Sequence, residues 1–413
     1  MTYSGRDGTL AFVPRSSNSP TRLPDGAVLR SATAADLPAL EALTAEREGP
    51  DDAVDLRLAA LSPGGFDRIG VVEVDGEVAA TATLLDEQVR VGSVTLRAGQ
   101  IELVAASVRH EHRGYVRALT DWCHEKSIQR GNIIGVMIGI PNFYRQFGYH
   151  YSIPMHPWAE SLMAPQASAR LGVRAATAAD VPALQTLQEQ AQSTYDVAMP
   201  HQPECWQWLL SHPSSQQWLV EDGDTPVGVA RIAAGDDWAD VGELTAVESE
   251  GTRTLIAHAH SLCAREGTVR VNHRPHVPGL SDLLAEPERR EWYYVRTPDV
   301  PALFRALAPE LMRRAHASGR ESGDALLSFY RSHLRLAWDR QEMTVTTGGP
   351  LQAPVSAGGS GVPLDALGSL VFGGGAEAVD SRFPDGLLGR QEELMHVLFP
   401  PQRADLLTWY LPS

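Results

Sequence analysis

The residues with the clearest capacity for chemistry lie in a short basic turn around residue 112. Residues 100–107 form an apolar run that predicts a buried strand, residues 110–114 read His-Glu-His-Arg-Gly, and a helical apolar spacing follows. The free N–H groups at a helix start attract anions, Arg113 and Arg117 can pair with a phosphate, and Gly114 lets backbone approach it closely. The turn therefore predicts a phosphate site, with an ordinary loop as the alternative.

A second candidate segment follows the predicted helix. Residues 133–140 predict another buried strand, and residues 141–149 contain the string Phe-Tyr-Arg-Gln-Phe-Gly-Tyr, in which Tyr144 stands second. This series of strand, basic turn, helix, strand and aromatic string resembles the GNAT acyltransferase superfamily. From Ala27 onward the chain is similar to the enhanced-intracellular-survival (Eis) type of that superfamily, which has a duplicated acetyltransferase fold and a third domain resembling a sterol carrier protein.

The resemblance implies acetyl-CoA as co-substrate and assigns its site by position. Backbone groups at a strand end would meet the pantetheine and the acetyl carbonyl, at Val104, Ala105 and Ala106. The pyrophosphate would lie against His112, Arg113, Gly114, Tyr115, Val116 and Arg117. Tyr144 would protonate the departing thiolate, which suits a phenol with a pKa of about 10; a packing role is the alternative. The C-terminal carboxylate of Ser413 would be the base that deprotonates the amine.

The sequence departs from the family pattern at two places. Glu111 stands where the pyrophosphate loop usually opens with Arg or Gln, and Val116 stands where a small residue is usual. A carboxylate beside a pyrophosphate is unfavourable unless it points away or pairs with His112 or Arg113. The chain also ends in Ser413, where Eis-type chains commonly end in an aromatic residue.

An internal repeat organises the first two thirds of the chain. Residues 29–40 return in similar form as residues 173–184, and each copy predicts a strand, a threonine helix cap and a helix. Each copy is followed by two strand-like runs around an Asp-Gly pair, at Asp75-Gly76 and Asp222-Gly223, which predicts a hairpin. One supersecondary plan is therefore used twice.

These patterns predict an α+β fold with tandem GNAT folds, in which mixed central sheets are flanked by helices, followed by a sterol-carrier-like α+β domain. The expected division is a flexible tail (residues 1–26), an N-terminal GNAT domain with the acetyl-CoA site (27–158), a second, degenerate GNAT domain (159–291) and the third domain (292–413). In the third domain a helix opens at residues 297–299 and three strands follow between residues 325 and 347.

Composition narrows the classes of function. The 413 residues carry a net charge of −16, which argues against nucleic acid as a partner and favours cationic small molecules. No run of 18 apolar residues exists, so we expect no membrane association. The three scattered cysteines indicate neither disulfides nor zinc, and His110 and His112 lack a third ligand, so we expect a cytoplasmic protein without a metal site. Lys126, the only lysine, is expected at an exposed helix end.

The function expected from the resemblance is acetyl transfer from acetyl-CoA to the primary amine of a small, cationic acceptor. Asp51, Asp52 and Asp55 could form an acidic lip for that cation or an ordinary charged loop. The alternatives are a non-catalytic ligand-binding protein on a GNAT scaffold and a GNAT-fold biosynthetic enzyme with altered CoA use. A homo-oligomer is also expected, with a hexamer as one candidate and with exposed aromatic residues at its interface, namely Trp206, Trp208 and Trp218.

Overall fold

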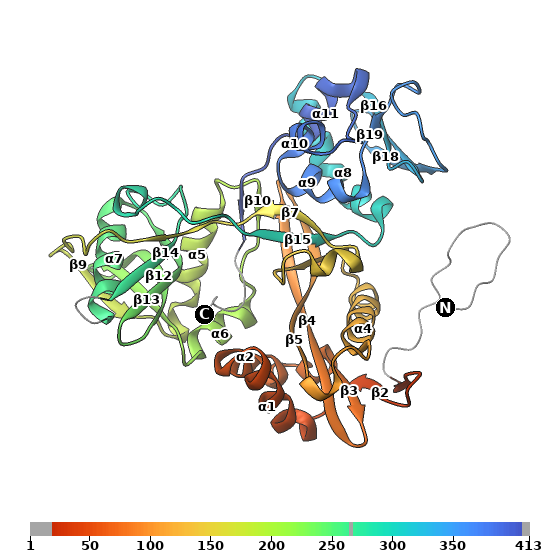
Figure 1. Ribbon diagram of the computed structural model, residues 1–413. Helices are drawn as coiled ribbons and strands as arrows, with labels where there is room; N and C mark the ends of the chain where they lie inside the picture. The colour runs from red at the N-terminus through yellow and green to blue at the C-terminus, as the bar shows by residue number, and fades with distance from the viewer. Residues whose placement is uncertain (1–18, 264–266, 407–413) are drawn as a thin grey trace. The chain divides into compact units, whose positions relative to one another are not determined.

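The computed structural model describes residues 19–263 and 267–406 (Figure 1). The chain forms two compact units. The first unit runs to Leu85 and adds Ile101–Asn132, and the second consists of Asp86–Gln100 and the residues from Ile133 on. The long strands β4 (Glu77–Val91) and β5 (Val94–Ala106) pass from one unit into the other.

The first unit is an antiparallel sheet with helices around it. Its strands are β1 (Thr21–Arg22), β2 (Val28–Ser31), β3 (Ile69–Val74) and the start of β4, paired in that order. Its helices are α1 (Leu37–Arg47), α2 (Pro50–Leu61), α3 (Gly65–Arg68) and α4 (Tyr115–Gln129). Helix α4 lies so close to β3 that a Cβ at Gly70 would stand 2.9 Å from both Leu119 and Trp122. The absence of a side chain at Gly70 thus allows α4, the helix that follows the basic turn, to pack closely against β3.

The second unit completes the first repeat with a strand from far along the chain. The order is β5, β6 (Ile134–Met137), β15 (Trp292–Arg296) and β7 (His150–Pro154). Strand β6 runs parallel to β5, whereas β15 is antiparallel to both β6 and β7. A segment that follows the second repeat is therefore inserted beside the strand that leads to Tyr144.

The second repeat has its own sheet, in the order β8-β14-β13-β12-β11-β9. The strands are β8 (Trp158–Glu160), β9 (Leu171–Ala175), β11 (Gln216–Asp222), β12 (Thr225–Ala234), β13 (Trp238–Ala246) and β14 (Thr268–Asn272). Its helices are α5 (Val181–Gln192), α6 (Pro203–Ser211) and α7 (Ser249–Leu262), and α7 packs on β12 and β13 (Figure 1).

The two sequence copies adopt the same local structure. Arg30 donates to both carboxylate oxygens of Asp36 at 2.8 Å, and Arg174 does so to Asp180 at 2.9 and 2.7 Å. Both aspartates also close a capping box with the preceding threonine, and both arginines bind a glutamate of the next strand. Both predicted hairpins form as well. The two copies thus share the same local hydrogen bonds.

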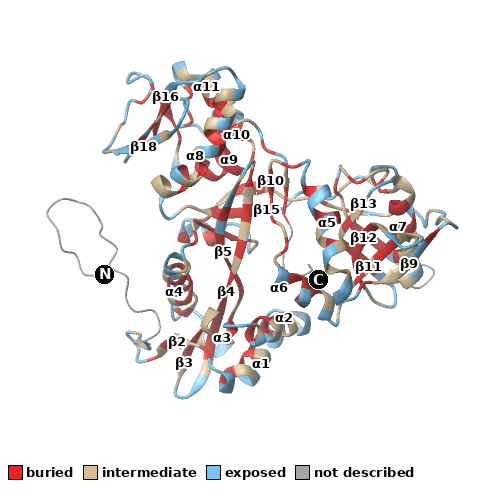
Figure 2. Ribbon diagram, turned by 180° about the vertical axis from the view of Figure 1, so that it is seen from behind, coloured by how far each residue is buried: buried red, intermediate tan, exposed pale blue. Residues whose placement is uncertain are grey.

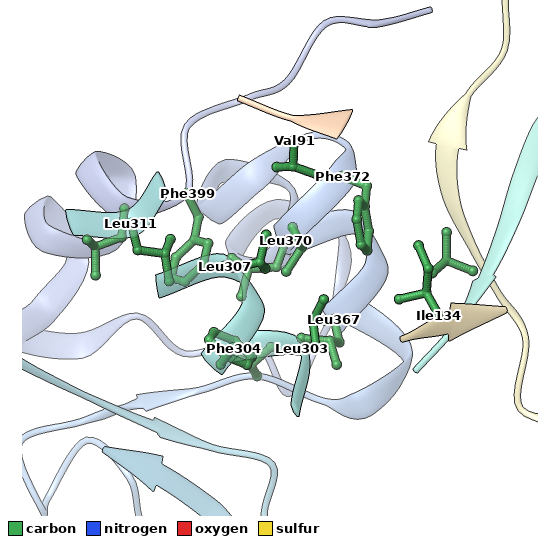
Figure 3. Packing of buried hydrophobic residues seen from close by; sticks show 14 of the residues in the cluster. Val91, Ile134, Leu303, Phe304, Leu307, Leu311, Leu367, Leu370, Phe372 and Phe399 are labelled. Carbon is green, nitrogen blue, oxygen red and sulfur yellow. The ribbon is translucent and has the colours of Figure 1, made fainter. Parts of the chain in front are cut away.

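The remaining residues form a four-stranded sheet with helices. The strands are β16 (Gly323–Ser328), β17 (His333–Trp338), β18 (Met343–Gly348) and β19 (Ser360–Gly361), and the helices are α8 (Val300–Ala317), α9 (Leu367–Phe372), α10 (Gly375–Arg382) and α11 (Glu392–Leu398). The hydrophobic core of these residues includes strands β4 and β6. Val91 of β4 and Ile134 of β6 belong to the same buried cluster as Phe304 and Phe372 (Figure 3). The α+β class is confirmed, and the four-part division stays a prediction.

Burial corrects two expectations (Figure 2). Trp206 and Trp208 are 2% and 6% exposed, so the prediction that they are surface aromatics is wrong. Lys126 is not at an exposed helix end, because it is 3% exposed, bound to Asp67 and 5.3 Å from the Trp122 ring. Within residues 19–263 and 267–406, no helix is both long and apolar enough to cross a membrane.

Candidate active site

The basic turn of the first unit has the geometry of an anion site. Helix α4 begins at Tyr115, directly after Gly114, and both His112 and Gly114 have left-handed backbone, with φ of 62° and 81°. No side chain caps the start of the helix, and no heavy atom lies within 4 Å of the position that a Gly114 Cβ would take. The helix start therefore has no side-chain cap, and the space beside Gly114 is open.

The side chains of the turn divide into outward and inward groups. His112, Arg113 and Arg117 are exposed, whereas the Tyr115 ring is buried. The Tyr115 hydroxyl donates to Asp25 Oδ2 at 2.6 Å. That hydrogen bond, followed by one from Ala27 and the nearby charge of Arg113, holds the pKa of Asp25 below its usual value. Tyr115 thus offers a ligand its backbone rather than its ring.

Glu111 is neutralised by a residue outside the turn. Arg47 Nη2, at the end of α1, lies 2.7 Å from Glu111 Oε1. The sequence suggested His112 or Arg113 as partners, and the structure provides Arg47 instead. The carboxylate therefore needs no cation from the turn.

The end of β5 holds a distortion that the sequence did not indicate. Leu103 has a φ of 52°, in the left-handed region that leucine rarely adopts. A residue in this conformation cannot continue a regular ladder, so backbone groups next to it, at Val104 to Ala106, can serve a ligand. Leucine carries no sequence signal for such a position.

Tyr144 lies in the second unit within a cluster of aromatic rings. It belongs to the short helix η3 (Phe143–Phe147), is 8% exposed, and has the rings of Phe143, Tyr149 and Tyr294 at centroid distances of 5.0, 6.5 and 6.5 Å. Its ring occupies the space that a side chain at Gly139 would need, since a Cβ there would stand 2.3 Å from Tyr144 Cε2. Ser413 lies outside the described residues.

The second repeat differs at the corresponding helix start. Glu250 lies in the first turn of α7, where it accepts a hydrogen bond from Ser168 and pairs with Arg170 at 2.7 Å. A negative side chain thus already occupies this helix start. The first turn of α4 carries no acidic residue.

The acidic residues of the first unit gather at the start of α2. Burial and the charge of Asp52 raise the pKa of Glu48, and burial followed by the charge of Asp51 raises that of Asp52. Asp55 is buried at 6% exposure. The acidic group therefore consists of Glu48, Asp51 and Asp52; Glu48 was missed, although it lies only four residues before Asp52 in the sequence.

Residues 44–152 match the protein-family model described as an acetyltransferase (GNAT) domain. This part of the chain is similar to a GNAT acetyltransferase domain. The match includes the basic turn and Tyr144, so the GNAT resemblance read from these segments is confirmed. The match supports acyl transfer in general, and acetyl-CoA is the donor typical of the matched family.

Solved structures show the same fold over nearly the whole chain. A GCN5-related N-acetyltransferase from Anabaena variabilis aligns with a TM-score of 0.69 at 15% identity, covering 92% of this chain and 98% of that one. One from Kribbella flavida gives 0.67 at 18%, covering 93% and 98%. Eis1 from Mycobacterium abscessus gives 0.59 at 15%, covering 92% and 99%. The search among curated proteins found no match.

Proposed function

We propose that the protein is an acetyl-CoA-dependent N-acetyltransferase of the Eis type, which acetylates the primary amine of a small, cationic acceptor. The observation that carries this proposal is the uncapped, open start of α4 inside the GNAT domain. Its first-turn N–H groups, together with the exposed Arg113 and Arg117, fit a pyrophosphate. Acetyl-CoA would supply an acetyl group already activated as a thioester.

The chain's own residues have separate tasks in this reaction. Backbone groups beside Leu103 polarise the acetyl carbonyl, which favours attack by the amine nitrogen. The Tyr144 hydroxyl donates its proton to the sulfur as the C–S bond breaks. The amine loses a proton to a base, for which the carboxylate of Ser413 is the candidate. The products are the N-acetylated amine and CoA.

The charge of the protein supports a cationic acceptor. The charge of Asp52 raises the pKa of Glu48, and the charge of Asp51 raises the pKa of Asp52, so like charges oppose one another in this group. A cation bound between them would relieve that repulsion. The net charge of −16 would also attract cations from a distance. A homo-oligomer and a cytoplasmic location remain part of the proposal.

The test combines binding and turnover. Calorimetry should show acetyl-CoA binding, and release of free CoA thiol should depend on a primary amine from a panel that includes spermidine, tyramine and a lysine peptide. Tyr144→Phe keeps the ring, so the affinity for acetyl-CoA and the melting temperature should stay unchanged. The kcat should fall by ~10²–10⁴-fold, because the proton donor is lost. Activity within threefold of wild type would remove Tyr144 as the acid.

The alternatives give different results in the same experiment. Absence of both acetyl-CoA binding and turnover would favour a non-catalytic binding protein that kept the scaffold and lost CoA. Turnover of an acceptor that does not depend on acetyl-CoA would favour a biosynthetic enzyme with altered CoA use. Glu111, the residue that argued for a loss of CoA, no longer does so, because its charge is paired with Arg47.

A further inference from the structure

The loop before Tyr144 has a backbone conformation that needs support. Asn142 is exposed and has a φ of 67°, and helix η3 begins at the next residue. Asparagine tolerates this left-handed region better than most residues, but the conformation persists only where surrounding contacts fix it. The direction of the chain at Asn142 determines where the Tyr144 ring, two residues later, is placed.

Two tyrosine hydroxyls provide that support. The backbone N–H of Asn142 donates to Tyr151 Oη and to Tyr294 Oη, both at 2.9 Å. Tyr151 and Tyr294 are register partners on the antiparallel strands β7 and β15, and their rings stack with centroids 4.4 Å apart. Tyr294 Oη also lies 3.5 Å from the carbonyl of Ile140. The pair thus holds the loop on both sides of Pro141.

We propose that Tyr151 and Tyr294 are positioning residues for Tyr144, because their hydroxyls fix the Asn142 backbone and the Tyr294 ring limits the movement of the Tyr144 ring. This inference rests on the proposed role of Tyr144 as the acid. Tyr294 belongs to β15, which follows the second repeat in the chain. A residue that follows the second repeat in the chain thus contacts the loop before Tyr144.

The pair is suited to a static role rather than to proton transfer. Tyr294 is 1% exposed, and burial, followed by its hydrogen bond with Tyr151, raises its pKa to about 12. Tyr294 therefore stays protonated and neutral over the pH range of ordinary assays. Its hydroxyl can accept the Asn142 N–H throughout that range.

The test compares Tyr151→Phe/Tyr294→Phe with Tyr144→Phe and with Tyr293→Phe. Tyr293 is a control on the same strand, and its hydroxyl donates to Gln100. The double variant should lose up to ~10²-fold in kcat, the usual effect of a misplaced group, with little change in KM for acetyl-CoA. Tyr293→Phe should lose stability and keep kcat.

Two further measurements separate positioning from general damage. In the Tyr144→Phe background the double substitution should lower kcat by less than about threefold further. The reason is that the effects of residues that act through one group are not additive. Amide exchange of residues 138–147 should accelerate in the double variant and not in Tyr293→Phe. Unchanged exchange, or a kcat within threefold of wild type where Tyr144→Phe is impaired, would overturn the inference and leave the proposed function intact. An unimpaired Tyr144→Phe would instead overturn the role of Tyr144, and the inference with it.

Discussion

Gly139→Ala tests the placement of Tyr144 without touching its hydroxyl. The added methyl carbon would stand 2.3 Å from Tyr144 Cε2, whereas unbonded carbons prefer about 3.5–4.0 Å. The φ of Gly139 is not in the left-handed region, so alanine fits the backbone and the ring must move by roughly 1 Å. A displacement of this size at a reacting group lowers kcat by ~10²-fold. The overpacking itself should cost about 1–3 kcal/mol of stability.

The assay measures kcat from thiol release, acetyl-CoA affinity by calorimetry and the melting temperature. Gly172→Ala is the matched control, because no heavy atom lies within 4 Å of its Cβ position. The φ of Gly172, like that of Gly139, lies outside the left-handed region. The control should retain wild-type activity. Gly139→Ala should retain acetyl-CoA affinity, and combining it with Tyr144→Phe should add little. A Gly139→Ala enzyme with kcat within threefold of wild type would refute the argument that the ring must stay in this place.

Two further predictions concern the anion site and a buried carboxylate. Arg113→Ala should weaken acetyl-CoA binding by ~1.5–3 kcal/mol in calorimetry. Glu111→Gln should change the dissociation constant by less than about threefold, because the charge of Glu111 is already paired with Arg47. Equal effects of the two substitutions would exclude Arg113 from the site. Glu310, 1% exposed at its side chain, has a pKa of about 2, because hydrogen bonds from Arg313, Arg314 and Ser93 outweigh its burial. Its folded pKa lies below the unfolded value of about 4.3, so its stabilisation is present above pH ~4 and is lost as the pH falls towards 2. Urea unfolding should show Glu310→Ala about 3–5 kcal/mol less stable at pH 7 and with a flatter dependence on pH from 4 to 2; an unchanged slope would contradict the assignment.

Sequence reasoning succeeded where the signal spans only a few residues. The threonine caps at Thr33 and Thr177, the Asp-Gly hairpins and the glycine before α4 each depend on neighbours along the chain, and each forms as expected. The prediction of an anion site in the basic turn depends on the same kind of local signal, since a helix start leaves its first N–H groups without partners inside the helix.

The same reasoning failed where the partner is distant. Nothing near Glu111 indicates Arg47, and nothing near Lys126 indicates that Asp67 and the Trp122 ring would allow its burial. Trp206 and Trp208 were misjudged because the sequence shows a hydrophobic residue but not the surface that covers it. Leu103 was missed because its positive φ is imposed by packing rather than by the preference of leucine.

The sequence by itself determined the local elements, the repeat and the residue types that suit acetyl transfer. Only the tertiary structure decided that β15 enters the sheet of the first repeat, so that Tyr294 meets Tyr151 and the backbone of Asn142. Strand pairing depends on hydrogen bonds and side-chain packing between segments separated by some 140 residues, and neither segment encodes its partner locally. The surroundings of Tyr144 are for this reason a property of the folded chain.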